Sequence, residues 1–372
     1  MASSPGIRDL LERARDFSSV LRLAKLRMGP QPFEWYPYES LSGLQHLEKL
    51  LAGDPRPLRE LIGDAPVLDI GCADGEMSFF FESLGYRVHA IDHRASNQNH
   101  MMGVRALKQA FESRIEISEI DLDSQFVLPG ERYGLALFLG TLYHLKNPFY
   151  VLDALSRQAS RCLLSTRIAR SAGGMRLEPL PVAYLVDEDE LNADDSNFWI
   201  FTEAGLRRLL KRTNWDVEAF ITVGDRQSSD PVSAQHDERA FCLVRSRWAL
   251  ANVELLRGWH AAEEAGWRWT AREFSFRAPV PAGDGPAVLK MSLYVNDRLF
   301  ETAPEVRLEG SVSGERLAVD VWRAPGRYVY ERRLPRPPDG YAEFEFALSA
   351  AIGPEPADPR ELGLVVASIR CD

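Results

Sequence analysis

The stretch PVLDIGCADGEMSFFF, residues 66–81, combines residue types that could hold a cofactor. Asp69, Gly71, Ala73 and Gly75 occupy alternate positions between a short apolar run and a helix-like segment. Glycine tolerates positive φ angles and lets the backbone approach a ligand closely. A strand, a tight turn and a helix in this order are typical of a nucleotide-binding element. We therefore expect a nucleotide-like ligand at this turn.

Two cofactor classes compete for the turn. The dinucleotide fingerprint is GxGxxG, with the pyrophosphate resting on the helix N-terminus. Here Ala73 and Glu76 stand at two of the three glycine positions. Unless it turns away, a carboxylate at Glu76 would oppose the phosphate charges that the helix dipole attracts. The residues at this turn therefore disfavour NAD or another dinucleotide.

Short apolar runs alternate with helical segments in the surrounding sequence. The predicted strands span 67–70, 87–91, 115–120, 134–139, 161–166, 216–221 and 240–245. The predicted helices span about 76–84, 97–113, 148–158 and 202–213, the last with Thr202 as its N-cap. Such alternation implies an α/β fold with a parallel sheet covered on both faces. The connection between the last two strands carries no helical pattern, which predicts an antiparallel final strand.

The spacing Asp69-x-Gly71-x-Ala73-x-Gly75 resembles the first motif of class I S-adenosylmethionine-dependent methyltransferases. The segment FLGTLYHLKNP, residues 138–148, is similar to the part of these enzymes that passes beneath the methionyl moiety. This segment and NFWIFTEAGLRRLLKRTNWDV resemble the subgroup of tRNA wobble-uridine carboxymethyltransferases and related small-molecule methyltransferases. The resemblance covers roughly residues 60–245. It implies a Rossmann-like seven-stranded sheet with an antiparallel last strand, and S-adenosyl-L-methionine as cofactor.

The same resemblance assigns cofactor contacts along the chain. Asp92 ends the second predicted strand, where an acid can accept hydrogen bonds from both ribose hydroxyls, a feature that NAD proteins share. Asp121 and Leu122 resemble the adenine contact that follows the third strand. The implied cofactor set is Asp69, Gly71, Ala73, Gly75, Asp92, His93, Asp121, Leu122, Gly140 and Thr141.

His144 is the candidate base. Methyl transfer requires an aligned acceptor and removal of its proton. An imidazole titrates near neutrality, and His144 follows the fourth predicted strand. Tyr143 either contacts the cofactor or orients the acceptor. The alternative is that both side chains only pack beside the loop.

Three regions are expected along the chain: an N-terminal helical or lid segment (1–58), a methyltransferase domain (59–248) and a β-sandwich accessory domain (249–372). The first includes IRDLLERARDFSSVLRLAKLR, whose apolar residues recur at helical spacing with a basic surplus. Such a helix covers the main domain or a partner subunit, or lies on a membrane surface.

The acidic insertion VDEDELNADDSN, residues 186–197, falls between the fifth strand and the following helix. It is either a solvated loop or a lid facing the acceptor, because ligands bind at the carboxyl ends of strands. Asp194, Asp195 and Asn197 could hold Mg²⁺, but no metal site is predicted.

Beyond residue 250 the pattern changes to period-2 alternation between Pro and Gly breakers, as in MSLYVND and YAEFEFAL. This is typical of an all-β sandwich. The segments GWHAAEEAGWRWT and DPRELGLVVASIRC resemble an accessory β-domain attached to bacterial enzymes of surface-polysaccharide biosynthesis. That resemblance implies a sugar or lipid-linked glycan acceptor. Trp259, Trp267 and Trp269 either stack on sugar rings or fill a domain junction.

Composition narrows the class of protein. The net charge of -10 argues against a broad electrostatic grip on nucleic acid. The four cysteines form no CxxC pair and read as buried thiols in a reducing compartment. The sequence has no apolar run long enough to span a bilayer and no signal-peptide pattern, so the cytoplasm is expected.

The predicted function is transfer of a methyl group from S-adenosylmethionine to an O or N atom of a small molecule or glycan. The cell-surface polysaccharide pathway is the expected context. Two alternatives stay open: a tRNA-modifying methyltransferase, and a scaffold that binds the cofactor without catalysis. The oligomeric state is open as well, with a homo-oligomer allowed.

Overall fold

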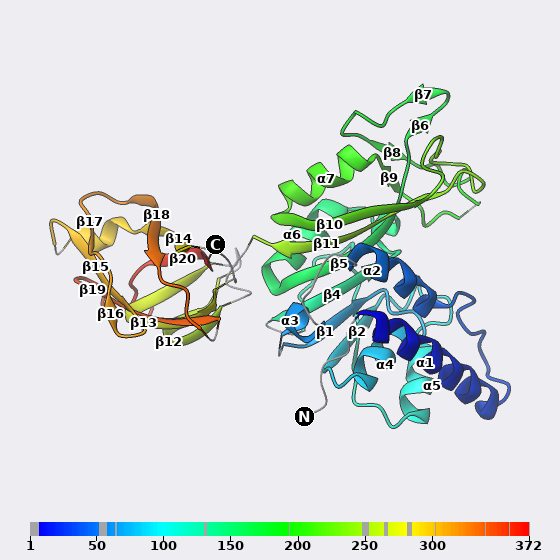
Figure 1. The fold of residues 1–372 in the computed structure, drawn as a ribbon, viewed down its shortest axis with the longest axis horizontal. Helices are drawn as coiled ribbons and strands as arrows, with labels where there is room; N and C mark the ends of the chain where they lie inside the picture. Colours follow the sequence, from blue (N-terminus) through cyan, green and yellow to red (C-terminus); the bar gives the residue numbers. More distant parts are fainter. Residues whose placement is uncertain are drawn as a thin grey trace. The chain divides into compact units, whose positions relative to one another are not determined.

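The chain divides into two compact units, each with its own core, in the computed structural model. Unit 1 comprises Met1–Ser246 and unit 2 comprises Arg247–Asp372. The structure describes residues 7–51, 58–63, 65–129, 132–192, 194–247, 253–263, 267–280, 285–301, 303–338, 340–356 and 358–371. Unit 1 combines helices with a sheet, whereas unit 2 is built from strands (Figure 1).

The sheet of unit 1 has the predicted strands. They are β1 (Val67–Ile70), β2 (Val88–Asp92), β3 (Glu116–Glu119), β4 (Tyr133–Leu139), β5 (Ala159–Ile168), β10 (Trp215–Gly224) and β11 (Glu238–Ser246). Their order is β10-β11-β5-β4-β1-β2-β3. Strands β1 to β5 pair in parallel, and β11 runs antiparallel to both β5 and β10. The predicted Rossmann-like sheet with an antiparallel last strand is confirmed.

Helices cover both faces of this sheet (Figure 1). One layer contains α1 (Ile7–Met28), η1 (Ser40–Gly43), α2 (Leu44–Leu51), α3 (Leu58–Ile62), α4 (Glu76–Ser83) and α5 (Met102–Ala110); the other contains α6 (Pro148–Gln158) and α7 (Glu203–Arg212). Strand side chains alternate between the two faces. Val67 packs in the core with α1 to α5, and Leu68 packs in the core with α6 and α7. The N-terminal helices therefore belong to the core of unit 1.

Helix starts follow local capping chemistry. The Thr202 hydroxyl accepts a hydrogen bond from the Gly205 N–H at 3.0 Å, as predicted for an N-cap. The helix predicted over residues 97–113 is shorter than expected and spans Met102–Ala110. The Asn97 carboxamide accepts from the Met101 N–H at 2.8 Å, so a side-chain turn replaces the first helical turn.

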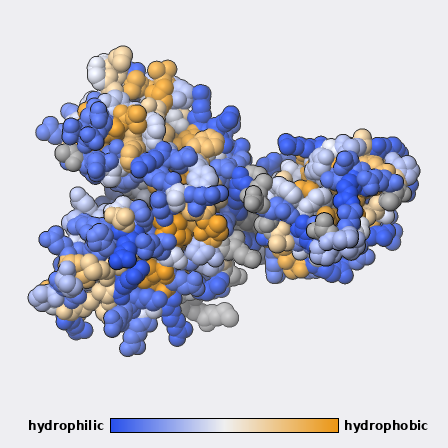
Figure 2. All heavy atoms as spheres, turned by 180° about the vertical axis from the view of Figure 1, so that it is seen from behind, coloured by the Kyte–Doolittle hydropathy of each residue, from blue (hydrophilic) through white to orange (hydrophobic). Residues whose placement is uncertain are grey.

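An insertion between β5 and α7 carries four short strands. They are β6 (Ser171–Ala172), β7 (Met175–Arg176), β8 (Ala183–Leu185) and β9 (Trp199–Phe201). Strand β9 joins the main sheet, since Phe201 pairs with Ile168 of β5. Apolar side chains gather on the surface over the β6–β9 insertion (Figure 2), where Met175, Leu180 and Leu185 are exposed.

Unit 2 is an antiparallel β-unit, as predicted. Its elements are β12 (Glu254–Ala262), β13 (Arg268–Pro279), β14 (Ala287–Val295), η4 (Asp297–Phe300), β15 (Val306–Val312), β16 (Glu315–Arg316), β17 (Asp320–Trp322), β18 (Gly326–Leu334), β19 (Tyr341–Leu348) and β20 (Val365–Cys371). Strand β13 pairs with β20 near its start and with β19 near its end, which joins both sides into one curled sheet. Its arrangement as a sandwich of two separate sheets stays a prediction.

The core of unit 2 is rich in aromatic rings. The rings of Phe276 and Phe344 stack with centroids 4.9 Å apart. Trp259 packs edge-on against Phe274 at 5.3 Å and donates its indole N–H to the Ser275 carbonyl. Trp259 thus has a structural role in this unit.

Two further expectations concern cysteines and membranes. All four cysteines are free and buried, as the sequence indicates. Of the helices in the described part of the chain, none is long and apolar enough to cross a membrane.

Candidate active site

Several of the predicted site residues lie at one edge of the unit 1 sheet. Gly71 follows β1, His93 follows β2 and Gly140 follows β4, and these three strands are neighbours running in the same direction. Strand β11 runs the opposite way, so its first residues, including Arg239, lie at this same edge. Ligands of open α/β sheets bind at the carboxyl ends of the parallel strands.

The glycine turn adopts a backbone that side chains would obstruct. Gly71 and Gly75 have φ angles of 70° and 82°. A Cβ atom on Gly71 would lie 2.4 Å from the Thr141 Oγ1, so the turn after β1 is pressed against the segment after β4. Gly140 also has a positive φ, of 78°, but a Cβ there would meet nothing within 4 Å. The edge is therefore closely packed at Gly71 and open at Gly140.

Ala73 stands where the family usually has its second glycine. Its φ is 50°, in the left-handed region that costs a residue with a Cβ about 1–2 kcal/mol. The Ala73 N–H donates to the Asp92 Oδ2 at 2.9 Å, which links the glycine turn to the end of β2. This contact helps to hold the left-handed conformation.

Asp92 lies where a ribose-binding acid is expected. Its carboxylate accepts from the Ala73 N–H, from the His93 N–H at 2.8 Å and from the Asn97 amide at 2.9 Å. Burial raises the pKa of Asp92, and the three hydrogen bonds act against that rise. These contacts orient a half-buried carboxylate at the edge of the sheet.

Asp69, by contrast, points into the protein. Its carboxylate accepts a hydrogen bond from the Ser78 hydroxyl at 2.6 Å, and burial raises its pKa to about 6. This contact ties β1 to α4 and supports the glycine turn from beneath. Leu122 packs in the core on the α6 side, and the Asp121 carboxylate accepts from the Asp123 N–H at 3.0 Å.

The N-terminal segment is fastened to the glycine turn by an ionic cluster that the sequence does not reveal. The Lys25 ammonium lies 3.2 Å from the Asp74 carboxylate and 3.1 Å from the Glu76 carboxylate. Asp74 also accepts from the Tyr36 N–H at 2.9 Å, and Glu76 from the Ser40 N–H at 3.0 Å. Both acids are thus used to hold residues 25–40 over the turn.

The ion pair with Lys25 changes the expected effect of Glu76 on a bound phosphate. Glu76 was expected to oppose phosphate groups unless it turned away from them, and the structure pairs it with Lys25. The ammonium compensates part of the local negative charge. Glu76 therefore gives weaker grounds against a dinucleotide than the sequence indicates.

Tyr36 brings the N-terminal segment close to the reacting edge. Its pKa is raised to about 12, first by burial and further by acidic neighbours that include the Asp92 carboxylate, and the Tyr143 side chain also interacts with it. The hydroxyl group is therefore protonated at neutral pH. Tyr36 lies within electrostatic reach of both the predicted ribose acid and the predicted acceptor side, and the sequence offered no signal for it beyond its aromatic surroundings.

His144 and Tyr143 belong to the short helix η2 (Leu142–His144), directly after β4. The His144 Nδ1 lies 3.0 Å from the Ser196 backbone oxygen and 3.0 Å from its hydroxyl oxygen. A backbone oxygen only accepts, so Nδ1 carries the proton and Nε2 keeps its lone pair. The Ser196 hydroxyl donates in turn to the Asp194 carboxylate at 2.5 Å.

Burial lowers the pKa of His144, whereas the Ser196 contact and the Asp194 charge act to raise it. The neutral form therefore dominates at pH 7. Neutral imidazole with a protonated Nδ1 is the form that accepts a proton at Nε2. The order Asp194, Ser196, His144 resembles the acid, linker and base of a proton-accepting relay.

The acidic insertion docks on this segment. The Phe198 N–H donates to the Tyr143 carbonyl at 2.8 Å, and the Trp199 indole donates to the Lys146 carbonyl at 3.2 Å. Asn197 is buried and donates to the Leu191 carbonyl at 3.3 Å. Within the described ranges, no group of three or more His, Cys, Asp or Glu residues could hold a metal ion.

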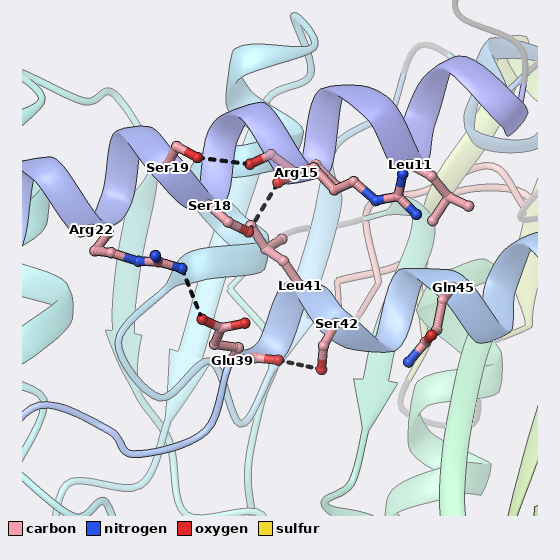
Figure 3. A pocket seen from close by; sticks show the side chains of 10 residues that line it. Leu11, Arg15, Ser18, Ser19, Arg22, Glu39, Leu41, Ser42 and Gln45 are labelled. Carbon is pink, nitrogen blue, oxygen red and sulfur yellow. Dashed lines mark hydrogen bonds and ion pairs between the residues drawn. The ribbon is translucent and has the colours of Figure 1, made fainter.

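A surface pocket of about 310 Å³ lies elsewhere, between α1 and the η1–α2 segment (Figure 3). Its lining includes Arg22, which pairs with Glu39 at 3.4 Å, and Ser18, which donates to the Ala14 carbonyl. None of the predicted site residues lines it.

Comparisons with known proteins agree with this geometry. Residues 44–219 match the family model described as a methyltransferase domain. Among curated proteins, none matches the chain. Because of the family match and the strand order of the sheet, residues 44–219 are a class I methyltransferase domain. The positive-φ glycines and the oriented Asp92 fit an adenosyl cofactor, and the cofactor of the domain is S-adenosylmethionine.

Solved structures with a similar arrangement share little sequence with this chain. The N-terminal domain of EvdMO1 with SAH bound is 17% identical, with a TM-score of 0.40, over 62% of this chain and 97% of its own. The [4+2]-cyclase SpnF is 16% identical, with a TM-score of 0.39, over 62% and 93%. An S-adenosylmethionine-dependent methyltransferase from Clostridium acetobutylicum is 12% identical, with a TM-score of 0.36, over 56% and 99%.

Proposed function

We propose that this protein transfers the methyl group of S-adenosylmethionine to an O or N atom of a small molecule or glycan. The observation that carries the proposal is the His144 geometry: its Nδ1 is held by Ser196, which leaves Nε2 as the basic atom. His144 lies in the short helix directly after β4. The end of β4 adjoins the glycine turn, because Thr141 lies against Gly71. A base beside the cofactor turn is what an acceptor O–H or N–H requires.

Different residues of the chain have different roles in the proposed reaction. The cofactor, when bound, supplies an electrophilic methyl group. Asp92 and the glycine turn position the adenosyl part, while Tyr36 and residues 25–40 cover it against water. His144 accepts the acceptor's proton at Nε2. The imidazolium that forms is stabilised by the Asp194 charge through Ser196.

The acceptor class is proposed on separate grounds. The net charge of -10 disfavours tRNA, because phosphate contacts need Lys and Arg on the binding face. The resemblance of unit 2 to accessory domains of surface-polysaccharide enzymes supports a sugar or lipid-linked glycan. We therefore place the reaction in the biosynthesis of a cell-surface polysaccharide.

The test is incubation of cell extract with isotopically labelled cofactor, followed by identification of the labelled product. We expect label in a small-molecule or glycan fraction. His144→Gln should reduce the rate about 10²- to 10⁴-fold, the usual contribution of a general base, while calorimetry shows unchanged binding of S-adenosylhomocysteine. Label in tRNA would identify a tRNA-modifying enzyme. Firm cofactor binding without label in any fraction would identify a scaffold.

A further inference from the structure

Two arginines face each other at the reacting edge. Arg167 of β5 and Arg239 of β11 are direct register partners in an antiparallel pair. Directly opposed side chains project from the same face of a sheet. Arg167 lies four residues after Leu163, and Arg239 lies two residues before Phe241, so each arginine projects from the same face as that apolar residue. This face is the one covered by α1 and α2 and by the N-terminal segment. Like charges in this arrangement repel each other unless an acid compensates them.

One carboxylate is shared between the two guanidinium groups. Asp237 lies 2.9 Å from the Arg167 Nη1 and 3.5 Å from the Arg239 Nε. The neighbouring acid Glu238 is fully buried and is held by Arg170 at 2.7 Å, so it compensates a different cation. Arg167 is almost entirely buried, whereas 38% of the Arg239 side chain is exposed. Of the two guanidinium groups, that of Arg239 is therefore the one that a ligand can reach.

The pair alone does not define a ligand site. At the other end of the same two strands, Arg161 and Arg245 are also register partners, and they share Glu218 at 3.1 and 3.5 Å. The difference is the surroundings. Arg239 lies at the carboxyl edge, with its guanidinium carbon 5.6 Å from the centre of the Tyr143 ring. Besides burial, its charge is among the groups that lower the pKa of His144, so it lies close to the proposed base.

We propose that Arg239, backed by Arg167, binds an anionic group of the methyl acceptor, a carboxylate or a phosphate. This inference rests on the proposed function. A guanidinium group is the side chain best suited to hold either anion in a bidentate manner. The acceptor is therefore an acid, such as a uronate or a sugar phosphate, whose anion fixes its O–H or N–H beside His144.

The cofactor also carries a carboxylate, on its methionyl part. Strand order separates the two sources of negative charge. Strand β11 is three strands away from β1, which corresponds to about 14 Å at ordinary strand spacing. The glycine turn that holds the cofactor follows β1, whereas Arg239 lies beyond β5, on the side of Tyr143. This position favours the acceptor over the cofactor.

The experiment compares full-length Arg239→Gln and Arg239→Lys with Arg245→Gln, a matched control with the same exposed fraction and an equivalent shared acid. Inorganic phosphate or acetate is mixed with each protein variant in the presence of saturating S-adenosylhomocysteine. Binding is measured as the broadening of the NMR signal of the phosphate or acetate. We expect saturable phosphate binding in the wild type and in Arg245→Gln, at least tenfold weaker binding in Arg239→Gln, and intermediate binding in Arg239→Lys.

Two further measurements separate the possible failures. Affinity for S-adenosylhomocysteine should change less than about threefold in Arg239→Gln; a tenfold loss would assign Arg239 to the cofactor and overturn the proposal. Labelled products from cell extract should be retained on an anion-exchange column, and neutral products would also overturn it. A third outcome is that phosphate binding depends on Arg239 but no product is labelled. This outcome would reject the proposed methyl transfer and support the anion site at Arg239.

Discussion

At the scale of single residues, the glycine turn and His144 show what sequence spacing can and cannot predict. The spacing of Asp69, Gly71 and Gly75 predicts a ligand-binding turn, because positive φ angles favour glycine. It does not separate Asp69, which is buried under the turn, from Asp92, which lies at the edge. The partner of His144 was equally hidden, since Ser196 is 52 residues away along the chain.

The first prediction concerns the pH dependence of the rate. Burial lowers the pKa of His144 from its usual 6.5, and Asp194 partly restores it. The neutral base is present above the lowered pKa, so kcat should fall only when the pH drops below 6.5. Asp194→Asn removes the restoring charge, which shifts this acid limb to lower pH. The exposed neighbour variant Asp195→Asn is the control, and a limb that shifts upward in Asp194→Asn would contradict the relay.

The second prediction uses two glycines that share a positive φ. Gly71→Ala places a Cβ 2.4 Å from the Thr141 Oγ1, whereas Gly140→Ala meets nothing within 4 Å. Both variants carry the left-handed strain of about 1–2 kcal/mol, so only the first adds a clash. We expect Gly71→Ala to unfold at a clearly lower temperature than Gly140→Ala, as measured by thermal melting. Equal melting temperatures would mean that the two segments are not in contact.

At the scale of elements, apolar runs predicted β1 to β5, β10 and β11, because the buried strands of such a sheet are rich in apolar residues. The short strands β8 and β9 of the same sheet were not predicted. The start of α5 was missed, since the Asn97 side chain bonds to the backbone and a propensity pattern does not show this. The ionic cluster that joins Lys25 of α1 to Asp74 and Glu76 at the glycine turn was missed for another reason. Lys25 and Asp74 are 49 residues apart, and long-range ion pairs leave no periodic signal.

The third prediction tests this ionic cluster. Lys25→Met leaves the buried Asp74 and the largely buried Glu76 without their cation, so the free energy of unfolding should fall by about 3 kcal/mol. The control is Arg22→Met, which breaks an exposed pair with Glu39 worth less than about 1 kcal/mol. Urea unfolding measures both. A similar small loss in the two variants would show that Lys25 does not clamp the turn.

At the scale of the whole molecule, two independent cores account for the two sequence patterns. Helix-period and strand-period segments alternate in unit 1, and period-2 strands alone follow in unit 2, as the sequence predicts. The curled connection of β13 to both β19 and β20 was beyond prediction, because strand pairing partners are not encoded in alternation. The arginine pair at the reacting edge depends on the same kind of register, and so it was missed as well.

We propose that the turn after β1 binds S-adenosylmethionine and that Asp92 binds its ribose. Isothermal titration calorimetry of the full chain with S-adenosylmethionine, S-adenosylhomocysteine and NAD tests it most directly. We predict saturable binding of the two adenosyl compounds and no binding of NAD. In Asp92→Asn, binding of the adenosyl compounds should be about tenfold weaker or more, because a hydrogen bond to a charged group is lost. Firm binding of NAD with no heat from either adenosyl compound would contradict it.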